Sequence, residues 1–235
     1  QEYVTDVIRE GFMYRGQSMP WPLQTSFHRT SRNDLYRYIS NDIPQLHRAL
    51  TGRTRHVFDL SKAQERGFLN LAQHHGFPTP LLDWTLSPFV AAYFAYSGVD
   101  DFTIDPPVRI LAFRYKLFKE QYQQIQHLTF VKPHFSILEA LSIENNRAVP
   151  QQGMLSLTNL RDVERHIMYL ERKSKEKYIY AFDLPRDEGI KVLHDLRLMG
   201  LTQATLFPGI ESICREMRRG NSSIHRASDS QNFSC

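Results

Sequence analysis

The stretch that most constrains the fold is residues 72–97, which read AQHHGFPTPLLDWTLSPFVAAYFAYS. Gly76 can take the left-handed conformation that ends a helix, and a proline soon after it bars continuation. Residues 81–85 are a short apolar run between prolines, which predicts a buried strand. Ser87 followed by Pro88 is typical of an N-cap and a first helical position. The sequence therefore predicts a helix end, a buried strand and a new helix in immediate succession.

This new helix is hydrophobic nearly all round over residues 89–96, so we expect it to lie in the core. Polar side chains lie at its rim: Asp83, Thr85 and the adjacent pair His74 and His75. Burying such groups without a partner costs about 1–3 kcal/mol each. We therefore expect them to be hydrogen-bonded or functional, with Asp83 buried and bonded to the backbone or to an arginine.

A second polar element lies near the start of the chain. Residues 12–14 predict a short strand that ends at Arg15, and Gly16 follows, where a close backbone approach or a positive φ is needed. The planar fork of an arginine is suited to holding a phosphate or carboxylate. The alternative is an ion pair between Arg15 and a core carboxylate such as Asp83.

The rest of the chain predicts an α+β fold, with mixed, mainly antiparallel sheets and surrounding helices, because strands and helices do not alternate regularly. We expect one domain over residues 1–220 and a polar, disordered tail over residues 221–235. Further elements are predicted as strands at 108–115, 154–157, 178–184 and 205–207 and as helices at 61–75, 137–146, 159–172 and 185–200.

The composition is that of an ordinary globular protein, with 41% hydrophobic and 23% charged residues. The longest apolar run falls far short of the about 20 residues that a membrane span needs, so we expect no membrane association. Two cysteines give neither a disulfide framework nor a metal cluster and favour a cytoplasmic location. His74 and His75 point about 100° apart on a helix and cannot share a metal ion, so no metal is expected.

The sequence resembles the FRG domain family in three blocks. The matching residues are Tyr14-Arg15-Gly16-Gln17 with Trp21-Pro22-Leu23 and Arg29, then residues 72–76, Pro78-Thr79, residues 81–85 and Ser87-Pro88, and more weakly residues 147–153.

The order of polar residues also bears a more distant resemblance to ADP-ribosyltransferases. That resemblance implies an ADP-ribosyltransferase-like fold, with NAD as substrate in a cleft formed by Arg15, Thr85, Ser87 and Gln152. It implies binding and catalytic residues as follows: for NAD binding, Tyr14, Arg15, Gly16, Gln17, Trp84, Thr85 and Ser87, and for catalysis, Arg15, Thr85, Gln152 and His74.

One residue departs from the pattern that this resemblance implies. Gln152 stands where those enzymes carry a glutamate, and an amide can hydrogen-bond a ribose hydroxyl but cannot stabilise positive charge as a carboxylate does. Glu144, Glu164 and Asp83 are the candidate substitutes.

Three functions follow from these residues. The first is an NAD-using, ADP-ribosyltransferase-like or NAD-hydrolysing toxin or antiviral defence effector, which has a nucleic acid or protein as acceptor and a regulatory partner. The second is a non-catalytic module that binds a nucleotide or a protein. The third is a metal-independent ribonuclease using His74 or His75 with Arg15, because a neutral histidine is the usual base near pH 7.

Overall fold

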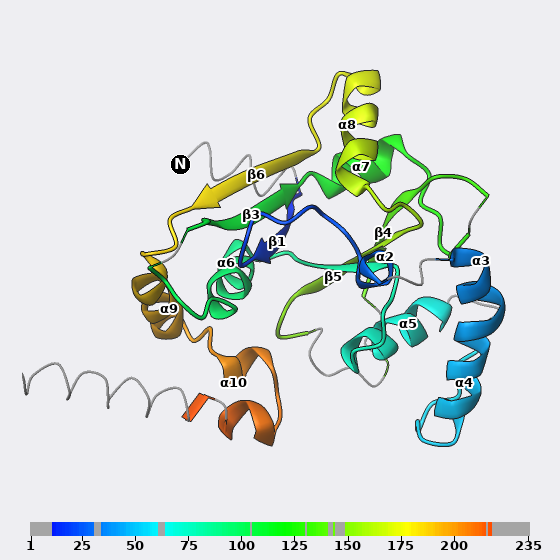
Figure 1. Cartoon of the computed structure of the whole chain (residues 1–235), viewed down its shortest axis with the longest axis horizontal. Coiled ribbons are helices and arrows are strands. Elements are labelled where there is room, and N and C mark those ends of the chain that lie inside the picture. The colour runs from blue at the N-terminus through cyan, green and yellow to red at the C-terminus, as the bar shows by residue number, and fades with distance from the viewer. Residues whose placement is uncertain are drawn as a thin grey trace, which may run out of the picture.

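A computed structural model describes residues 11–30, 34–60, 64–103, 105–129, 131–140, 143, 149–214, 216 and 217. The tail expected at residues 221–235 lies outside these ranges. The described part contains a six-stranded antiparallel sheet with helices packed around it (Figure 1). This confirms the predicted α+β class. None of the described helices has the length and apolar character needed to cross a membrane.

The strands follow one another along the sheet in the order β4-β5-β2-β1-β3-β6. Their bounds are β1 (Met13–Gln17), β2 (Leu81–Thr85), β3 (Val108–Phe113), β4 (Phe135–Glu139), β5 (Gly153–Thr158) and β6 (Ile179–Leu184). The helices are α2 (Ser26–Arg29), α3 (Leu35–Arg37), the π-helix η1 (Tyr38–Asp42), α4 (Ile43–Thr51), α5 (Gln64–His74), α6 (Pro88–Ser97), α7 (Tyr115–Gln121), α8 (Val163–Ser174), α9 (Gly189–Leu198) and α10 (Gln203–Leu206).

The sheet opens at its centre, between β1 and β2. Among the described residues these two strands pair only where Tyr14 lies opposite Thr85. By contrast, β1 pairs with β3 along its whole length, and β2 pairs with β5 along its whole length. Beyond the single paired position, β1 and β2 therefore diverge and leave a gap in the sheet.

Apolar side chains fill both faces of the sheet. On one face, Phe118 of α7 and Ile167 of α8 pack with Trp84 and Phe113 of the strands. On the other face, α5 covers β2 and β5, with Phe68 in that core cluster. Helix α6 packs mainly on β1 and is itself covered by α9. The gap between β1 and β2 is therefore bordered by helices that the core holds in place.

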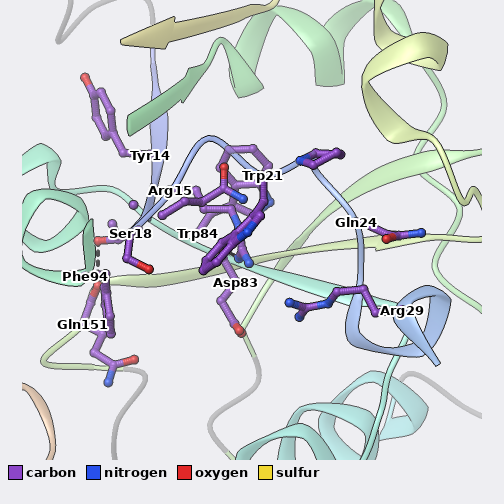
Figure 2. A pocket seen from close by; sticks show the side chains of 14 residues that line it. Tyr14, Arg15, Ser18, Trp21, Gln24, Arg29, Asp83, Trp84, Phe94 and Gln151 are labelled. Carbon is purple, nitrogen blue, oxygen red and sulfur yellow. Dashed lines mark hydrogen bonds between the residues drawn. The ribbon is translucent and has the colours of Figure 1, made fainter. Parts of the chain in front are cut away.

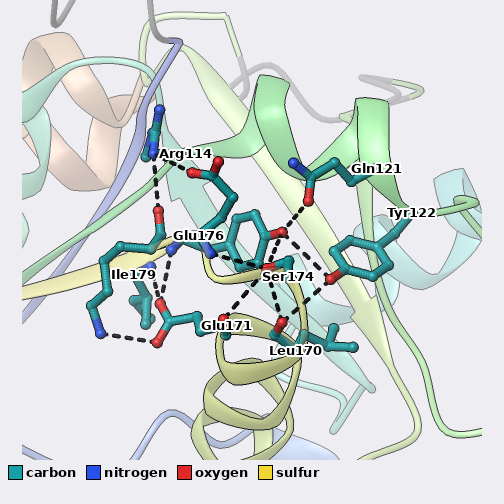
Figure 3. Close-up of polar contacts among 10 residues, drawn as sticks. Arg114, Gln121, Tyr122, Leu170, Glu171, Ser174, Glu176 and Ile179 are labelled. Atoms are coloured by element: carbon teal, nitrogen blue, oxygen red, sulfur yellow. Dashed lines mark hydrogen bonds and ion pairs between the residues drawn. The ribbon is translucent and has the colours of Figure 1, made fainter.

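A polar cluster fixes the start of β6 against α8 (Figure 3). The Glu171 carboxylate accepts hydrogen bonds from the backbone N–H of Tyr178 at 2.8 Å and of Ile179 at 3.0 Å. The hydroxyl of the buried Tyr178 in turn donates to Ser174 Oγ at 2.9 Å. These bonds satisfy backbone groups at the edge of the sheet, so we assign this cluster a structural role.

Several predicted elements agree with the structure. The strand predicted at residues 81–85 is β2, and the predicted core helix is α6, with Ser87 as its N-cap. The predicted first strand is β1, which continues to residue 17, so Arg15 lies at its middle and not at its end.

Two predicted elements are wrong. The helix expected from residue 137 is strand β4 where the structure describes it, because residues 135–138 are buried on both sides and pair with β5. A short apolar run of this kind cannot be assigned from periodicity alone. The strand expected at residues 205–207 is the end of α10 and the residue that follows it, and Thr202 caps this helix through a capping box.

Candidate functional site

A cavity of about 460 Å³ opens in the gap between β1 and β2, within the size range of small-molecule sites (Figure 2). Its walls come from β1 and the loop after it, the end of α2, β2, α6 and the turn before β5. The lining residues that matter below are Arg15, Gln17, Trp21, Arg29, Asp83, Thr85, Phe94 and Gln151.

Asp83 was expected to be buried, but it is exposed, because it lies where β2 faces the cavity. Arg15 and Asp83 face each other across this gap. The Arg15 Nη1 donates a hydrogen bond of 2.6 Å to the backbone carbonyl oxygen of Asp83, an acceptor that the diverging β1 backbone leaves unpaired. The Nε of Arg15 is buried and has no hydrogen-bond partner among the described residues. Because buried polar groups are nearly always satisfied, this atom lacks a partner that it would ordinarily have.

A second guanidinium, that of Arg29, lines the same cavity from the end of α2 and points towards Asp83 (Figure 2). Burial lowers the pKa of Arg15, Asp83 opposes this effect, and the positive charge of Arg29 adds to it. An arginine nevertheless stays protonated at neutral pH. The cavity thus presents two positive groups and one carboxylate, and the guanidiniums are suited to an anionic ligand such as a diphosphate.

The cavity also offers aromatic surfaces. Trp21, 48% exposed, and Phe94 line it. Trp84, which the sequence placed in the NAD site, is 3% exposed; its indole N–H donates to Ser156 Oγ at 2.9 Å, and its ring packs near Phe113 in the core. Trp84 is part of the cavity lining, but its ring is held in the core, so Trp21 offers the more exposed aromatic surface.

Gly16 and Gln17 line the cavity from the end of β1. A Cβ on Gly16 would lie 1.9 Å from the backbone oxygen of Ala91, so β1 approaches α6 closely at this point, as expected of that glycine. Gln17 is only 8% exposed, and its Oε1 has no hydrogen-bond partner among the described residues. Like the Arg15 Nε, this amide oxygen lacks the partner that a buried polar atom ordinarily has.

Thr85 holds the turn before β5. Its buried hydroxyl donates to the backbone oxygen of Gln151 at 2.7 Å and accepts from the Ser87 N–H at 3.1 Å. Gln152 has a φ of 48°, in the left-handed region, and is exposed outside the cavity lining. This backbone conformation reverses the chain, so Gln151 and not Gln152 lines the cavity.

Two other predicted site residues have structural contacts. Ser87 is absent from the cavity lining, and its Oγ accepts the Val90 N–H at 3.3 Å as the cap of α6. Tyr14 is part of the cavity lining, but its ring points away from Arg15 and Asp83 in Figure 2 and is stacked near Phe12, with ring centroids 6.3 Å apart. Burial raises the pKa of Tyr14.

A smaller cavity of about 250 Å³ adjoins the first and shares Asp83, Trp84, Phe94 and Gln151 with it. His74 and Gln73 of α5 line this second cavity. The neighbouring His75 is exposed and absent from both linings. The structure therefore places His74 next to the main cavity but not in it.

No group of three or more potential metal-ligating side chains is found among the described residues. The residue types present favour an organic anion, which the two guanidiniums, the aromatic rings and the unpaired amide can bind together. The main cavity is thus a candidate nucleotide site.

The sequence did not predict that Trp21 and Arg29 line the main cavity or that Gln73 lines the smaller one, although all three lie within the quoted motif blocks. Each comes from a different segment, and only the pairing of β1 and β2 with their neighbours brings these segments together.

Comparison with known proteins gives one match. Residues 10–103 match the family model of the FRG domain, which confirms the resemblance for this part of the chain. The match includes every cavity residue named above except Gln151. The chain matches no curated protein and no solved structure.

Proposed function

Starting from an FRG domain at residues 10–103, we propose that the main cavity binds NAD and that the chain cleaves the bond between nicotinamide and ribose. ADP-ribose then passes to water or to a macromolecular acceptor, as in ADP-ribosyltransferases. The observation that carries the proposal is that the carboxylate of Asp83 and the guanidiniums of Arg15 and Arg29 line one cavity (Figure 2).

The two arginines account for binding. NAD carries a diphosphate, and arginine forks form charge-assisted hydrogen bonds with phosphate oxygens. Arg15 has a buried Nε without a protein partner, and no hydrogen bond or ion pair of the Arg29 side chain is found among the described residues. Trp21 and Phe94 supply surfaces for the base or the nicotinamide ring.

The carboxylate of Asp83 accounts for the cleavage step. When the carbon–nitrogen bond breaks, the electron pair leaves with nicotinamide and positive charge develops on the sugar. A fixed carboxylate beside the sugar stabilises that charge in the transition state. Asp83 is the carboxylate in the described cavity lining, so it takes the role that the amide at residue 151 or 152 cannot perform.

The arrangement of segments also supports the proposal. The resemblance to ADP-ribosyltransferases implies that a basic residue, a Ser/Thr–helix element and a later strand meet at one site. Here Arg15 lies on β1, Thr85 ends β2 before α6, and Gln151 precedes β5. These three strands are neighbours in the sheet.

Calorimetric titration of the chain with NAD tests the binding step. Each charge-assisted bond is worth about 1.5–3 kcal/mol, so we expect Arg15→Ala to weaken binding about tenfold to a hundredfold, and Arg15→Lys to recover only part of this loss. Arg48 is exposed on α4 and absent from the cavity lining, so Arg48→Ala is the matched control and should bind NAD as the wild type does. Equal affinity in all four proteins, or no NAD binding, would reject the proposal.

A second candidate is a module that binds a nucleotide without cleaving it. The observation that favours it is the turn before β5, where Gln151 lines the cavity in place of a carboxylate and its Nε2 donates to the backbone oxygen of Leu206 at 3.0 Å. NAD binding that depends on Arg15, with no release of nicotinamide, would support this candidate.

A further inference from the structure

The side chain of Asp83 lines both cavities, and Gln73 of α5 contacts it. The Gln73 Nε2 donates to Asp83 Oδ2 at 2.6 Å. The Gln73 Oε1 accepts a hydrogen bond from the hydroxyl of Thr79. Both ends of the Gln73 amide are therefore engaged, one by Thr79 and the other by Asp83.

The direction of these bonds sets the charge state that they favour. A hydroxyl that donates to the amide oxygen leaves the amide NH₂ facing Asp83 as a donor. A donor at this distance bonds more strongly to a carboxylate than to a neutral carboxyl group. The Thr79–Gln73 pair therefore favours the ionised form of Asp83.

Thr79 is held independently of its own hydroxyl. It is completely buried, its N–H donates to Ser26 Oγ at 2.9 Å, and its carbonyl oxygen accepts from the Phe27 N–H at 3.1 Å. These backbone bonds link the residue to α2. A chain of fixed contacts thus runs from α2 through Thr79 and Gln73 to Asp83.

We propose that Gln73 and Thr79 are positioning residues that hold the Asp83 carboxylate ionised and fixed in direction at the boundary between the two cavities. The use of that carboxylate in catalysis rests on the proposed function, whereas the contacts themselves are present in the protein without ligand.

Desolvation by the surrounding protein explains why Asp83 needs contacts that favour its ionised form. Solvent reaches its side chain in the cavity, but the surrounding protein raises the pKa of Asp83, while Arg15 and the Gln73 hydrogen bond lower it. The other ionisable groups that line these cavities are Tyr14 of β1, whose ring points away from Asp83, Arg29 at the end of α2 and His74 of α5. From α6 and the turn before β5 come Phe94 and Gln151, which carry no charge.

Carbon-13 NMR of the aspartate carboxyl groups in the ligand-free chain measures the pKa of Asp83 directly, with Asp83→Asn identifying its signal. We expect Gln73→Met, of similar volume and without an amide, to raise the pKa of Asp83 by about one unit or more. Thr79→Val removes the hydroxyl but keeps the shape, and it should raise the pKa by a smaller amount. Thr79→Ser retains the hydroxyl and should leave the pKa where it is in the wild type.

An unchanged Asp83 pKa in Thr79→Val and Gln73→Met would overturn the proposal, and so would equal shifts in Thr79→Val and Thr79→Ser. If Gln73→Met does not fold, the two Thr79 variants decide the question. Nicotinamide release adds a second measurement: its rate falls as Asp83 becomes protonated at low pH, so the acid limb should move to higher pH in Thr79→Val and not in Thr79→Ser. If the wild type does not bind NAD, the proposed function fails, while the NMR titration still tests the roles of Gln73 and Thr79.

Discussion

Single residues near the gap between β1 and β2 divide into those that face the cavity and those that hold its walls. Arg15, Arg29 and Asp83 bring charge into the cavity, whereas the hydroxyls of Thr85 and Ser87 are occupied by backbone partners. Both kinds occur within the same sequence blocks. The presence of a polar residue in a motif therefore does not by itself identify a ligand-binding group.

A substitution at Gly16 tests the close packing of β1 against α6 in the cavity wall. An alanine Cβ at this position would overlap the Ala91 backbone oxygen. We therefore expect Gly16→Ala to lower the free energy of unfolding by about 3 kcal/mol or more. Urea denaturation measures this change. At Gly52 an added Cβ has nothing within 4 Å, so Gly52→Ala should leave the midpoint unchanged or raise it slightly. Similar midpoints for the two variants would show that β1 and α6 are not in close contact at Gly16.

Helices and strands were predicted correctly where residues close together in the sequence determine them. Ser87-Pro88 begins α6, and residues 81–85 form β2, because caps, prolines and short apolar runs act over a few residues. The prediction was wrong for β4, whose apolar residues fit a helix or a strand equally until pairing with β5 decides. Gln151 lines the cavity where Gln152 was predicted, because the positive φ of Gln152 turns the chain at this point.

Ser87 allows the structural and binding roles of α6 to be separated. Loss of an N-cap side chain costs about 1 kcal/mol, so we expect Ser87→Ala to be less stable by about that amount. Because Ser87 does not line the cavity, NAD affinity should stay within about twofold of that of the wild type. Denaturation and calorimetry on the same preparation check both points, with Ser87→Asp as the cap-retaining control. A large loss of affinity at unchanged stability would make Ser87 a ligand contact, as the sequence first indicated.

For the whole molecule, the site depends on the separation of two strands that are neighbours in one sheet. The single paired position between β1 and β2 keeps the two halves of the sheet together, and their divergence beyond it provides the cavity. The α+β class was predictable from the mixture of elements, but this gap was not. It arises from pairing between segments about 70 residues apart, which no local pattern records.

The central claim is that this cavity uses the carboxylate of Asp83 to cleave NAD. The most direct test is nicotinamide release from NAD by the wild type and by Asp83→Asn, measured with and without added RNA, DNA or protein. We expect release by the wild type and a loss of about a hundredfold or more in Asp83→Asn, which keeps the size of the side chain but not its charge. NAD affinity should remain within a few fold. Equal release by the two proteins, or cleavage of RNA by a wild type that neither binds nor consumes NAD, would contradict the claim.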